Sequence, residues 1–323
     1  MILIDQAEVR ARLTYDLCIP IVRKAMIALS SGQTRQHLRS IIPLIDGRMF
    51  GIMPGALGEN ADFGAKLISV FPDNFAKGVQ SHQGVVVLFD AQNGAPVCVA
   101  HAGEITAIRT AAASAVATDA LARPDASRLA LLGYGEQAQT HLRALIHVRP
   151  IAEVTVWGRS SDRAQAFAHR MRDETGLAVV ACADVPTATA GADIICTVSS
   201  AAEPILQAAW VASGTHINVV GSSYAGPSEI DSALVVVSRF IADSREGVLL
   251  QGAEFLRAKA AGLIGDDHVV GEIGQVLAGR LAGRQSDDQI TVYKSLGHIV
   301  QDLASVRALM EIRGFEIDRI DDK

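Results

Sequence analysis

Aromatic residues are scarce in this sequence: Phe, Trp and Tyr together make up 5% of its 323 residues. Ala, Val, Ile and Leu abound instead, as is typical where small and branched side chains pack helices on a parallel sheet. Long hydrophobic runs are also missing, because every apolar run is too short or too interrupted to span a bilayer. The first residues, MILIDQAEVR, lack the basic start and apolar core of a signal peptide. We therefore expect a cytoplasmic protein without a membrane partner.

Cysteine and histidine show no spacing that indicates a disulfide framework or a metal site. The four cysteines lie far apart without a C-x-x-C pair, which is typical of reduced thiols. The nine histidines form no H-x-x-x-H or H-x-H pair, so we expect no metal. Excess positive charge is absent too: the formal net charge is −6, and Lys and Arg are scattered, which argues against a nucleic-acid partner.

Two kinds of pattern divide the chain, whose length suggests roughly two domains. Residues 125–285 alternate short apolar β runs with helical patterns, which predicts an α/β, doubly wound sheet of the Rossmann type. Residues 33–99 are mostly strand-like and precede an Ala-rich helix over 104–122, which indicates a second, α+β domain. That helix stops at Arg123-Pro124-Asp125, and we place the domain boundary at this Pro-containing hinge.

Local signals predict the individual elements. We expect a short helix after Asp5 and a second helix from Thr14 to near Gly32. We also expect strands over 50–54, 64–70, 84–89, 129–132, 154–157, 192–197, 215–220 and 234–237, a hairpin turn over 90–94, and a last long helix over 295–310 that buries Leu296, Ile299, Val300, Leu303 and Val306.

The strongest motif follows the strand over 129–132. Gly133-Tyr134-Gly135-Glu136-Gln137-Ala138 stands between this strand and a helical pattern, and matches G-x-G-x-x-G/A of dinucleotide-binding folds. Gly133 makes the tight turn, Gly135 lets the backbone approach a pyrophosphate, and Ala138 lets the helix pack closely. A glycine triplet alone also fits a plain tight turn, but the β-α-β context favours a nucleotide site at the helix N-terminus.

The end of the next strand bears on the choice of cofactor. NAD-binding folds usually place an acidic residue here, whereas this chain has Gly158-Arg159-Ser160-Ser161. Arg159 can pair with a ribose 2′-phosphate, and Ser160 can donate a hydrogen bond to it. The alternative is a solvated arginine in a turn. We expect NADPH as the preferred cofactor and NADH as a second one.

Three cations of the first domain are candidates for substrate binding. Arg109 lies early in the Ala-rich helix, where a cation opposes the helix dipole unless an anion is near. Lys66 interrupts an apolar strand, and Arg39 precedes another. Each one taken singly also fits a surface charge, but together they can bind a carboxylate.

These motifs resemble the ornithine cyclodeaminase/μ-crystallin family over nearly the whole chain. The matching segments are Arg39-Ser40, residues 53–55, Lys66 with residues 72–74, residues 103–112, the Gly133 loop, residues 218–223 and residues 283–297.

The resemblance implies a homodimer whose subunit is discontinuous. Residues 1–122 and 295–323 would form the substrate-binding and dimerisation domain, and residues 123–294 the NAD(P)-binding domain. Arg39, Lys66 and Arg109 would hold a substrate carboxylate beside the nicotinamide. We assign the cofactor to Thr110, Gly133, Gly135, Glu136, Gln137, Ala138, Gly158, Arg159, Ser160, Thr197, Val198, Val220 and Gly221.

Two departures from the cyclodeaminase pattern bear on the reaction. Ser223 stands where cyclodeaminases carry an Asp, and Gly51 where they carry a Glu. Deamination with ring closure needs such carboxylates, whereas hydride transfer to an imine depends more on positioning. We therefore expect an NAD(P)H-dependent reductase of a cyclic imine carboxylate: Δ1-pyrroline-2-carboxylate, giving L-proline, or its six-membered analogue, Δ1-piperideine-2-carboxylate, giving L-pipecolate.

Lys66 and Ser223 are the catalytic candidates. Ser223 would orient the imine nitrogen, or alternatively only cap its turn. Three other functions stay open: an ornithine cyclodeaminase, an alanine-dehydrogenase-like enzyme, and a non-enzymatic binding protein. The triplet of cations favours catalysis on a small imino or amino acid, because a structural protein needs no carboxylate clamp.

Overall fold

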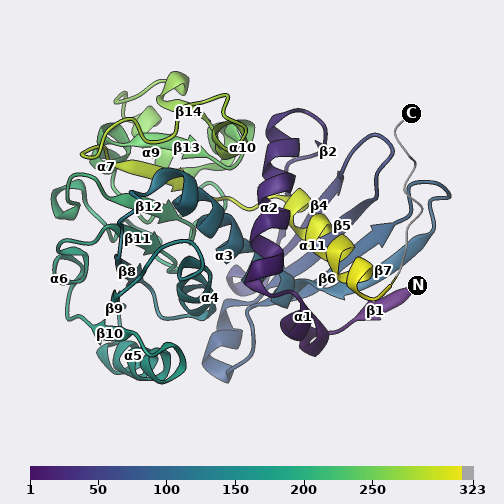
Figure 1. The fold of residues 1–323 in the computed structure, drawn as a ribbon, viewed down its shortest axis with the longest axis horizontal. Helices are drawn as coiled ribbons and strands as arrows, with labels where there is room; N and C mark the ends of the chain where they lie inside the picture. The colour runs from purple at the N-terminus through teal and green to yellow at the C-terminus, as the bar shows by residue number, and fades with distance from the viewer. Residues whose placement is uncertain (315–323) are drawn as a thin grey trace. The chain divides into compact units, whose positions relative to one another are not determined.

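The computed structural model describes residues 1–314, which form two compact units (Figure 1). The first comprises Met1–Arg109 and the described residues from His298 on, and the second comprises Thr110–Gly297. The division falls inside the Ala-rich helix, whereas the sequence places it after residue 122. Among residues 1–314, no helix has the length and apolar character that crossing a membrane requires.

The first unit is built on a seven-stranded sheet in the order β1-β7-β6-β5-β4-β2, with β3 also paired to β4. Only the pair β1–β7 is parallel. The elements are β1 (Ile2–Ile4), α1 (Gln6–Arg12), α2 (Tyr15–Ser30), β2 (Arg35–Gln36), β3 (Ser40–Pro43), β4 (Met49–Ala56), β5 (Phe63–Val70), β6 (His82–Phe89), β7 (Pro96–His101), the start of α3 (Ala102–Leu121), and α11 (Ile299–Ile312), with 3-10 turns at Ile45–Gly47 and Pro72–Lys77.

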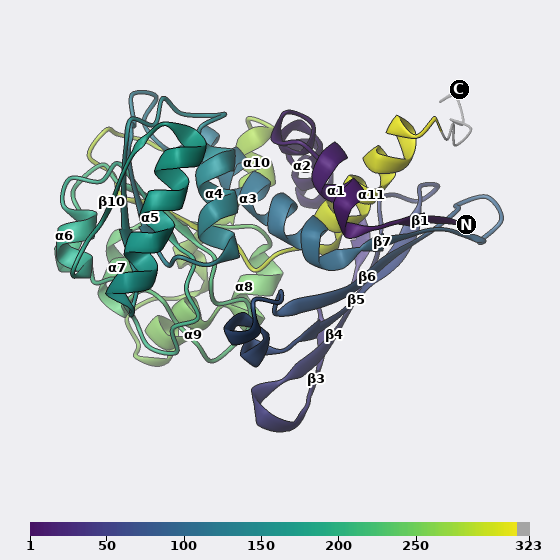
Figure 2. The ribbon, with the colours of Figure 1, turned by 90° about the horizontal axis from the view of Figure 1, so that it is seen from below.

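Helix α11 packs on this sheet at two glycines. A β-carbon at Gly55 would lie 2.6 Å from the Ile299 side chain, and one at Gly64 would lie 3.0 Å from that of Leu303. The missing side chains of β4 and β5 therefore let the helix lie close to the strands. Figure 2 shows α1, α2 and α11 together over these strands. Helix α11 is thus part of the unit that begins with Met1.

The second unit has an eight-stranded sheet in the order β10-β9-β8-β11-β12-β15-β13-β14, and every pair in it is parallel. Its elements are β8 (Arg128–Leu132), α4 (Glu136–Leu145), β9 (Glu153–Trp157), α5 (Ser161–Thr175), β10 (Ala178–Ala181), α6 (Val185–Thr189), β11 (Ile194–Thr197), β12 (His216–Val219), α7 (Ser232–Val237), β13 (Arg239–Ala242), α8 (Arg245–Gln251), α9 (Ala253–Ala260), β14 (Val269–Glu272), α10 (Ile273–Leu277) and β15 (Thr291–Lys294), with 3-10 turns at Ala208–Trp210 and Asp266–His268.

The strand order confirms the predicted fold class. From β8 the chain runs to β9 and β10 on one side, then returns to place β11 on the other side of β8. Such a reversal defines the switch point of a doubly wound sheet, where ligands bind at the carboxyl ends of the strands. Helices α6, α7, α8 and α9 cover one face through a buried cluster that includes Leu132, Ile217, Phe240 and Phe255.

Two predicted elements differ from the structure. The run Leu234–Val237 is not a strand but the end of α7, because Asp231 accepts a hydrogen bond from the Leu234 amide and begins a helix. The last helix begins at Ile299 rather than at Ser295. Leu296 lies before it and packs in the apolar core of the second unit.

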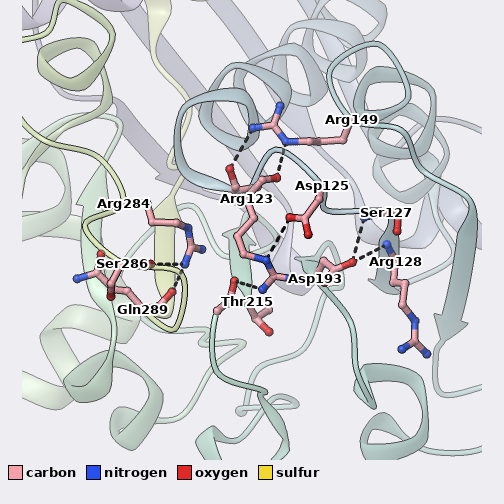
Figure 3. Close-up of polar contacts among 12 residues, drawn as sticks. Arg123, Asp125, Ser127, Arg128, Arg149, Asp193, Thr215, Arg284, Ser286 and Gln289 are labelled. Atoms are coloured by element: carbon pink, nitrogen blue, oxygen red, sulfur yellow. Dashed lines mark hydrogen bonds and ion pairs between the residues drawn. The ribbon is translucent and has the colours of Figure 1, made fainter.

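The segment after α3, predicted as a hinge, is anchored within the second unit (Figure 3). The Arg123 guanidinium donates to Asp193 at 2.5 Å and to the Gly214 carbonyl at 3.2 Å. Arg149 and Arg284 donate to backbone carbonyls at the end of α3, including those of residues 118, 119, 121 and 122. These bonds satisfy carbonyls that a helix C-terminus leaves without partners, and they tie the segment to the second unit.

Candidate functional site

The glycine turn lies at the switch point of the second unit. Gly133 follows β8 with a φ of 139°, a conformation that favours glycine. A β-carbon there would come 2.6 Å from the Val198 carbonyl oxygen, at the end of β11. Only glycine therefore fits between these two strand ends, as the dinucleotide motif requires.

The first turn of α4 provides the anion site that the motif predicts. Gly135 is the N-cap of this ten-residue helix, and no side chain caps it. A helix N-terminus, where backbone N–H groups point outward and the dipole favours negative charge, is the arrangement that binds a pyrophosphate. Ala138 is fully buried, so it lets α4 pack closely. These observations fit a dinucleotide cofactor.

The end of β9 places Arg159 and Ser160 at the start of α5. Ser160 is the N-cap of that helix and accepts a hydrogen bond from the Arg163 amide. Arg159 is exposed, and its guanidinium makes no hydrogen bond or ion pair within residues 1–314. Both groups can therefore still donate to a phosphate.

Two predicted cofactor residues, Thr197 and Gly221, bond to a buried carboxylate, Glu229, which was not predicted from the sequence. The Glu229 carboxylate accepts hydrogen bonds from the Thr197 hydroxyl at 2.8 Å and from the Gly221 amide at 2.6 Å. It also accepts from the amide and hydroxyl of Ser199. Burial raises the pKa of Glu229. The Glu229 carboxylate therefore fixes Thr197 and Gly221 in place at the carboxyl ends of β11 and β12.

A second buried group lies under the end of β12, beside the predicted Ser223. Lys294 lies 2.7 Å from a Glu254 carboxylate oxygen and donates to the Ser222 hydroxyl at 2.6 Å. Ser222 also donates to Glu254. Ser223 is half-buried, and its hydroxyl makes no hydrogen bond within the described residues. Ser222 is thus anchored by these bonds, whereas Ser223 is not.

The cations predicted to bind substrate lie together in the first unit. Lys66 projects from β5 onto the face that also carries Gly64 and Ile68, because alternate strand residues share a face. Its side chain is 2% exposed, and that of Arg109 on α3 is 5% exposed. Arg39 is half-buried before β3, and its charge lowers the pKa of Lys66.

The main partner of these cations is Asp302 of α11, which the sequence analysis missed. One Asp302 oxygen accepts from Lys66 Nζ at 2.9 Å and from Arg109 Nε at 3.2 Å. Burial raises the pKa of this carboxyl, but the charges of Arg109 and Lys66 outweigh that effect and keep it below its ordinary value. Asp302 shares the apolar face of its helix with Ile299, Leu303 and Val306. The sequence did contain a signal for Asp302, because this charged residue interrupts a helix face that was predicted to be buried.

Neutral histidines complete the surroundings of this cationic cluster. Burial, with the nearby positive charges, lowers the pKa of His82 and of His298 to about 4 each. Burial also lowers the pKa of Lys66 to about 8, although Asp302 opposes the shift. At neutral pH the cluster therefore contains charged Lys66, Arg109 and Arg39 with uncharged imidazoles.

Comparisons with known proteins match the chain along almost its full length. The model of the "Ornithine cyclodeaminase/mu-crystallin family" matches residues 1–313. The ketimine reductase mu-crystallin of Mus musculus is 35% identical over 91% of each chain. A Δ1-pyrroline-2-carboxylate reductase of Bacillus cereus is 31% identical over 96% of each chain.

Solved structures show the same fold. The Δ1-pyrroline-2-carboxylate reductase of Thermococcus litoralis, in complex with NADH and L-proline, has a TM-score of 0.93 and 31% identity, covering 96% of this chain and 97% of its own. An archaeal alanine dehydrogenase dimer with bound NAD has a TM-score of 0.89 and 28% identity, covering 96% of this chain and 95% of its own.

Proposed function

Because the chain belongs to the ornithine cyclodeaminase/mu-crystallin family and is an oxidoreductase, we propose that it reduces a cyclic imine carboxylate. The substrate we propose is Δ1-pyrroline-2-carboxylate, giving L-proline, with the six-membered imine as a second substrate. The names of its relatives and the L-proline bound by the Thermococcus enzyme support this choice.

The observation that carries the proposal is an excess of buried positive charge. Lys66 and Arg109 are two buried cations that share a single carboxylate, Asp302, and Arg39 adds a third charge nearby. A buried charge without a counter-ion is costly. A substrate carboxylate supplies the missing negative charge, and Arg109 can hold it through two parallel N–H groups.

The geometry also supports a proton donor for the imine nitrogen. Reduced nicotinamide supplies the hydride when it is bound. Lys66 keeps one ammonium hydrogen beyond those that it donates to Thr106 and Asp302. Its pKa of about 8 suits an acid that gives up a proton near neutral pH. Lys66 therefore protonates the nitrogen, and Ser223 stays a predicted catalytic residue.

For the cofactor we propose NADPH before NADH. The exposed guanidinium of Arg159 has no partner within residues 1–314, and it stands where NAD-specific folds carry an acidic residue. A 2′-phosphate there gains a charged, bidentate partner. The Thermococcus relative binds NADH, which supports NADH as a second cofactor.

Purified protein incubated with NADPH or NADH and Δ1-pyrroline-2-carboxylate tests the proposal. We expect the absorbance of the reduced cofactor to fall, with L-proline formed in equal amount. Two parallel reactions, ornithine without reductant and pyruvate with ammonia and reductant, test the cyclodeaminase and alanine-dehydrogenase alternatives. Ammonia release from ornithine without any imine reduction would exclude the proposed activity.

We also propose a homodimer formed through the first unit. Strand β3 is an edge strand that pairs only with β4, and Ile42, Leu44 and Ile45 near it are 51%, 42% and 74% exposed. Apolar side chains on an exposed edge are usually covered by another chain. The dimeric archaeal relative supports this assembly. Light scattering on the wild type and on Ile45→Asp tests it: we expect a dimer for the wild type and a monomer for the variant.

A further inference from the structure

We propose that Asp302 is a positioning residue, whose carboxylate holds Lys66 and Arg109 in place and leaves their remaining N–H groups for the substrate. This inference rests on the proposed function, because it assigns a role to a residue that does not itself bind the imine. Three observations support it: the pattern of donors, the attachment of α11, and the balance of charge.

The donors of both cations are divided between the protein and an open position. Lys66 has three N–H groups, of which one goes to Thr106 at 2.5 Å and one to Asp302 at 2.9 Å. Arg109 has five, of which Nε goes to Asp302 and one Nη1 hydrogen goes to Gln301 at 2.7 Å. Within residues 1–314, one donor of Lys66 and three of Arg109 are therefore left. That is enough for a bidentate carboxylate and a proton.

Asp302 holds the two cations from a single point. The same oxygen, Oδ1, accepts from both Lys66 and Arg109, while Oδ2 is buried without a partner in the described part of the chain. Neighbouring residues of α11 pack against glycines of β4 and β5, so the carboxylate cannot follow a movement of the cations. The relative position of Lys66 and Arg109 thus depends on one atom of a third element, in addition to the bond from Lys66 to Thr106 of α3.

The charge of Asp302 also keeps Lys66 protonated. Burial and the neighbouring cations favour the neutral amine, and the aspartate opposes them. Removing its charge would leave Lys66 facing cations and uncharged imidazoles only. The titratable and charged groups around Lys66 are Arg39 before β3, His82 on β6, Arg109 on α3, His298 before α11, and Asp302 on α11.

An NMR titration of the protein carrying isotope-labelled lysine tests the charge effect without any substrate. Lys66→Met identifies the Lys66 signal. In Asp302→Asn we expect the pKa of Lys66 to fall by about one unit or more, as the loss of an adjacent opposite charge predicts. Asp62→Asn is the matched control, because Asp62 is 1% exposed and pairs with Arg307 of the same helix. An unchanged Lys66 titration in Asp302→Asn, or an equal shift in Asp62→Asn, would overturn the proposal.

Steady-state kinetics test the positioning effect. Asp302→Glu retains the charge but moves the carboxylate, so we expect the KM for the imine to rise about tenfold or more while Lys66 titrates near its wild-type pH. This variant also decides the question if Asp302→Asn does not fold: an unchanged KM would contradict positioning. Failure of the wild type to reduce any imine would instead reject the proposed function, and the titration would still report on Asp302.

Discussion

The ring of Tyr134 lies directly over Gly158: a β-carbon on Gly158 would come 2.2 Å from two ring carbons. Tyr134 of the glycine turn therefore packs on the end of β9, where we predict that the choice between NAD and NADP is made. The two cofactor motifs are one structural unit, although 23 residues of sequence lie between their central members.

This contact predicts the effect of Gly158→Ala. The added methyl group must displace Tyr134, and with it the turn that receives the pyrophosphate, so we expect the dissociation constant of NADPH to rise about tenfold. Fluorescence titration of the cofactor measures it. In Tyr134→Ala/Gly158→Ala the obstruction is gone, and binding should recover toward that of Tyr134→Ala alone. Wild-type affinity in Gly158→Ala would refute the contact.

Arg159→Ala should weaken NADPH selectively. Loss of a charged hydrogen-bonding partner costs about 1.5–3 kcal/mol, or roughly 10- to 100-fold in affinity. The KM for NADH should change little, because NADH has no 2′-phosphate. Arg170→Ala is the control, since Arg170 lies on α5, the helix that follows Arg159, against Phe167. Equal losses for both cofactors would show that Arg159 does not contact the phosphate.

Arg109→Ala should raise the KM for the imine carboxylate about 100-fold, because a bidentate charged pair is lost. Arg109→Lys retains the charge but not the two parallel N–H groups, so its KM should lie between those of Arg109→Ala and the wild type. The exposed pair of Arg35 and Glu59 in the same unit supplies the control: Arg35→Ala should leave the kinetics unchanged. A wild-type KM in Arg109→Ala would show that Arg109 does not bind the substrate carboxylate.

The pH profile of kcat/KM should follow Lys66. The protonated amine is the active form, so the rate should be constant below its pKa of about 8 and fall about tenfold per pH unit above it. Lys66→Arg should lose most of the activity at every pH, since arginine retains the charge but does not give up a proton in this range. A wild-type profile that is flat to pH 10 would exclude Lys66 as the proton donor.

Buried histidines should make the protein less stable in acid. Burial lowers the pKa of His141 to about 4, and its ring bridges the Gln137 carbonyl and the Ser114 hydroxyl. The unfolded chain binds this proton already near pH 6.5, so stability falls as the pH drops from 6.5 toward 4, by about 2 kcal/mol at pH 5 for this one group. Urea unfolding at pH 7 and pH 5 measures the loss. His141→Gln should reduce it, whereas the exposed His169→Gln should not.

Much of the fold could be predicted from the sequence because its signals are local. The glycine turn, the helix start at Asp5, and the strand that carries Lys66 depend on residues close together in the chain. The run Leu234–Val237 was wrongly predicted as a strand, because its branched side chains are typical of strands. The N-cap at Asp231 and the packing of α7 on α9 make it helical instead. Local propensity gives way to tertiary context there.

The site was predicted less completely, because its main contacts join distant parts of the sequence. Asp302 lies 236 residues from Lys66 and 193 from Arg109. Glu229 likewise meets Thr197 across 32 residues. A single sequence shows which residues are charged, but not which of them meet. Comparison with the cyclodeaminase pattern showed that carboxylates are missing at Gly51 and Ser223. The sequence did not show that the carboxylates of Asp302 and Glu229 would be buried at the site.

The attachment of α11 determines the order in which the units can form during synthesis. Strands β4 and β5 leave the ribosome early, yet the helix that fills the space over Gly55 and Gly64 is made last. The second unit has all its strands before that helix appears, so it can fold while the first sheet still exposes the face that α11 covers. Because domains generally fold as units as they emerge, the nascent chain has an interval in which the cofactor fold exists and the cationic cluster does not.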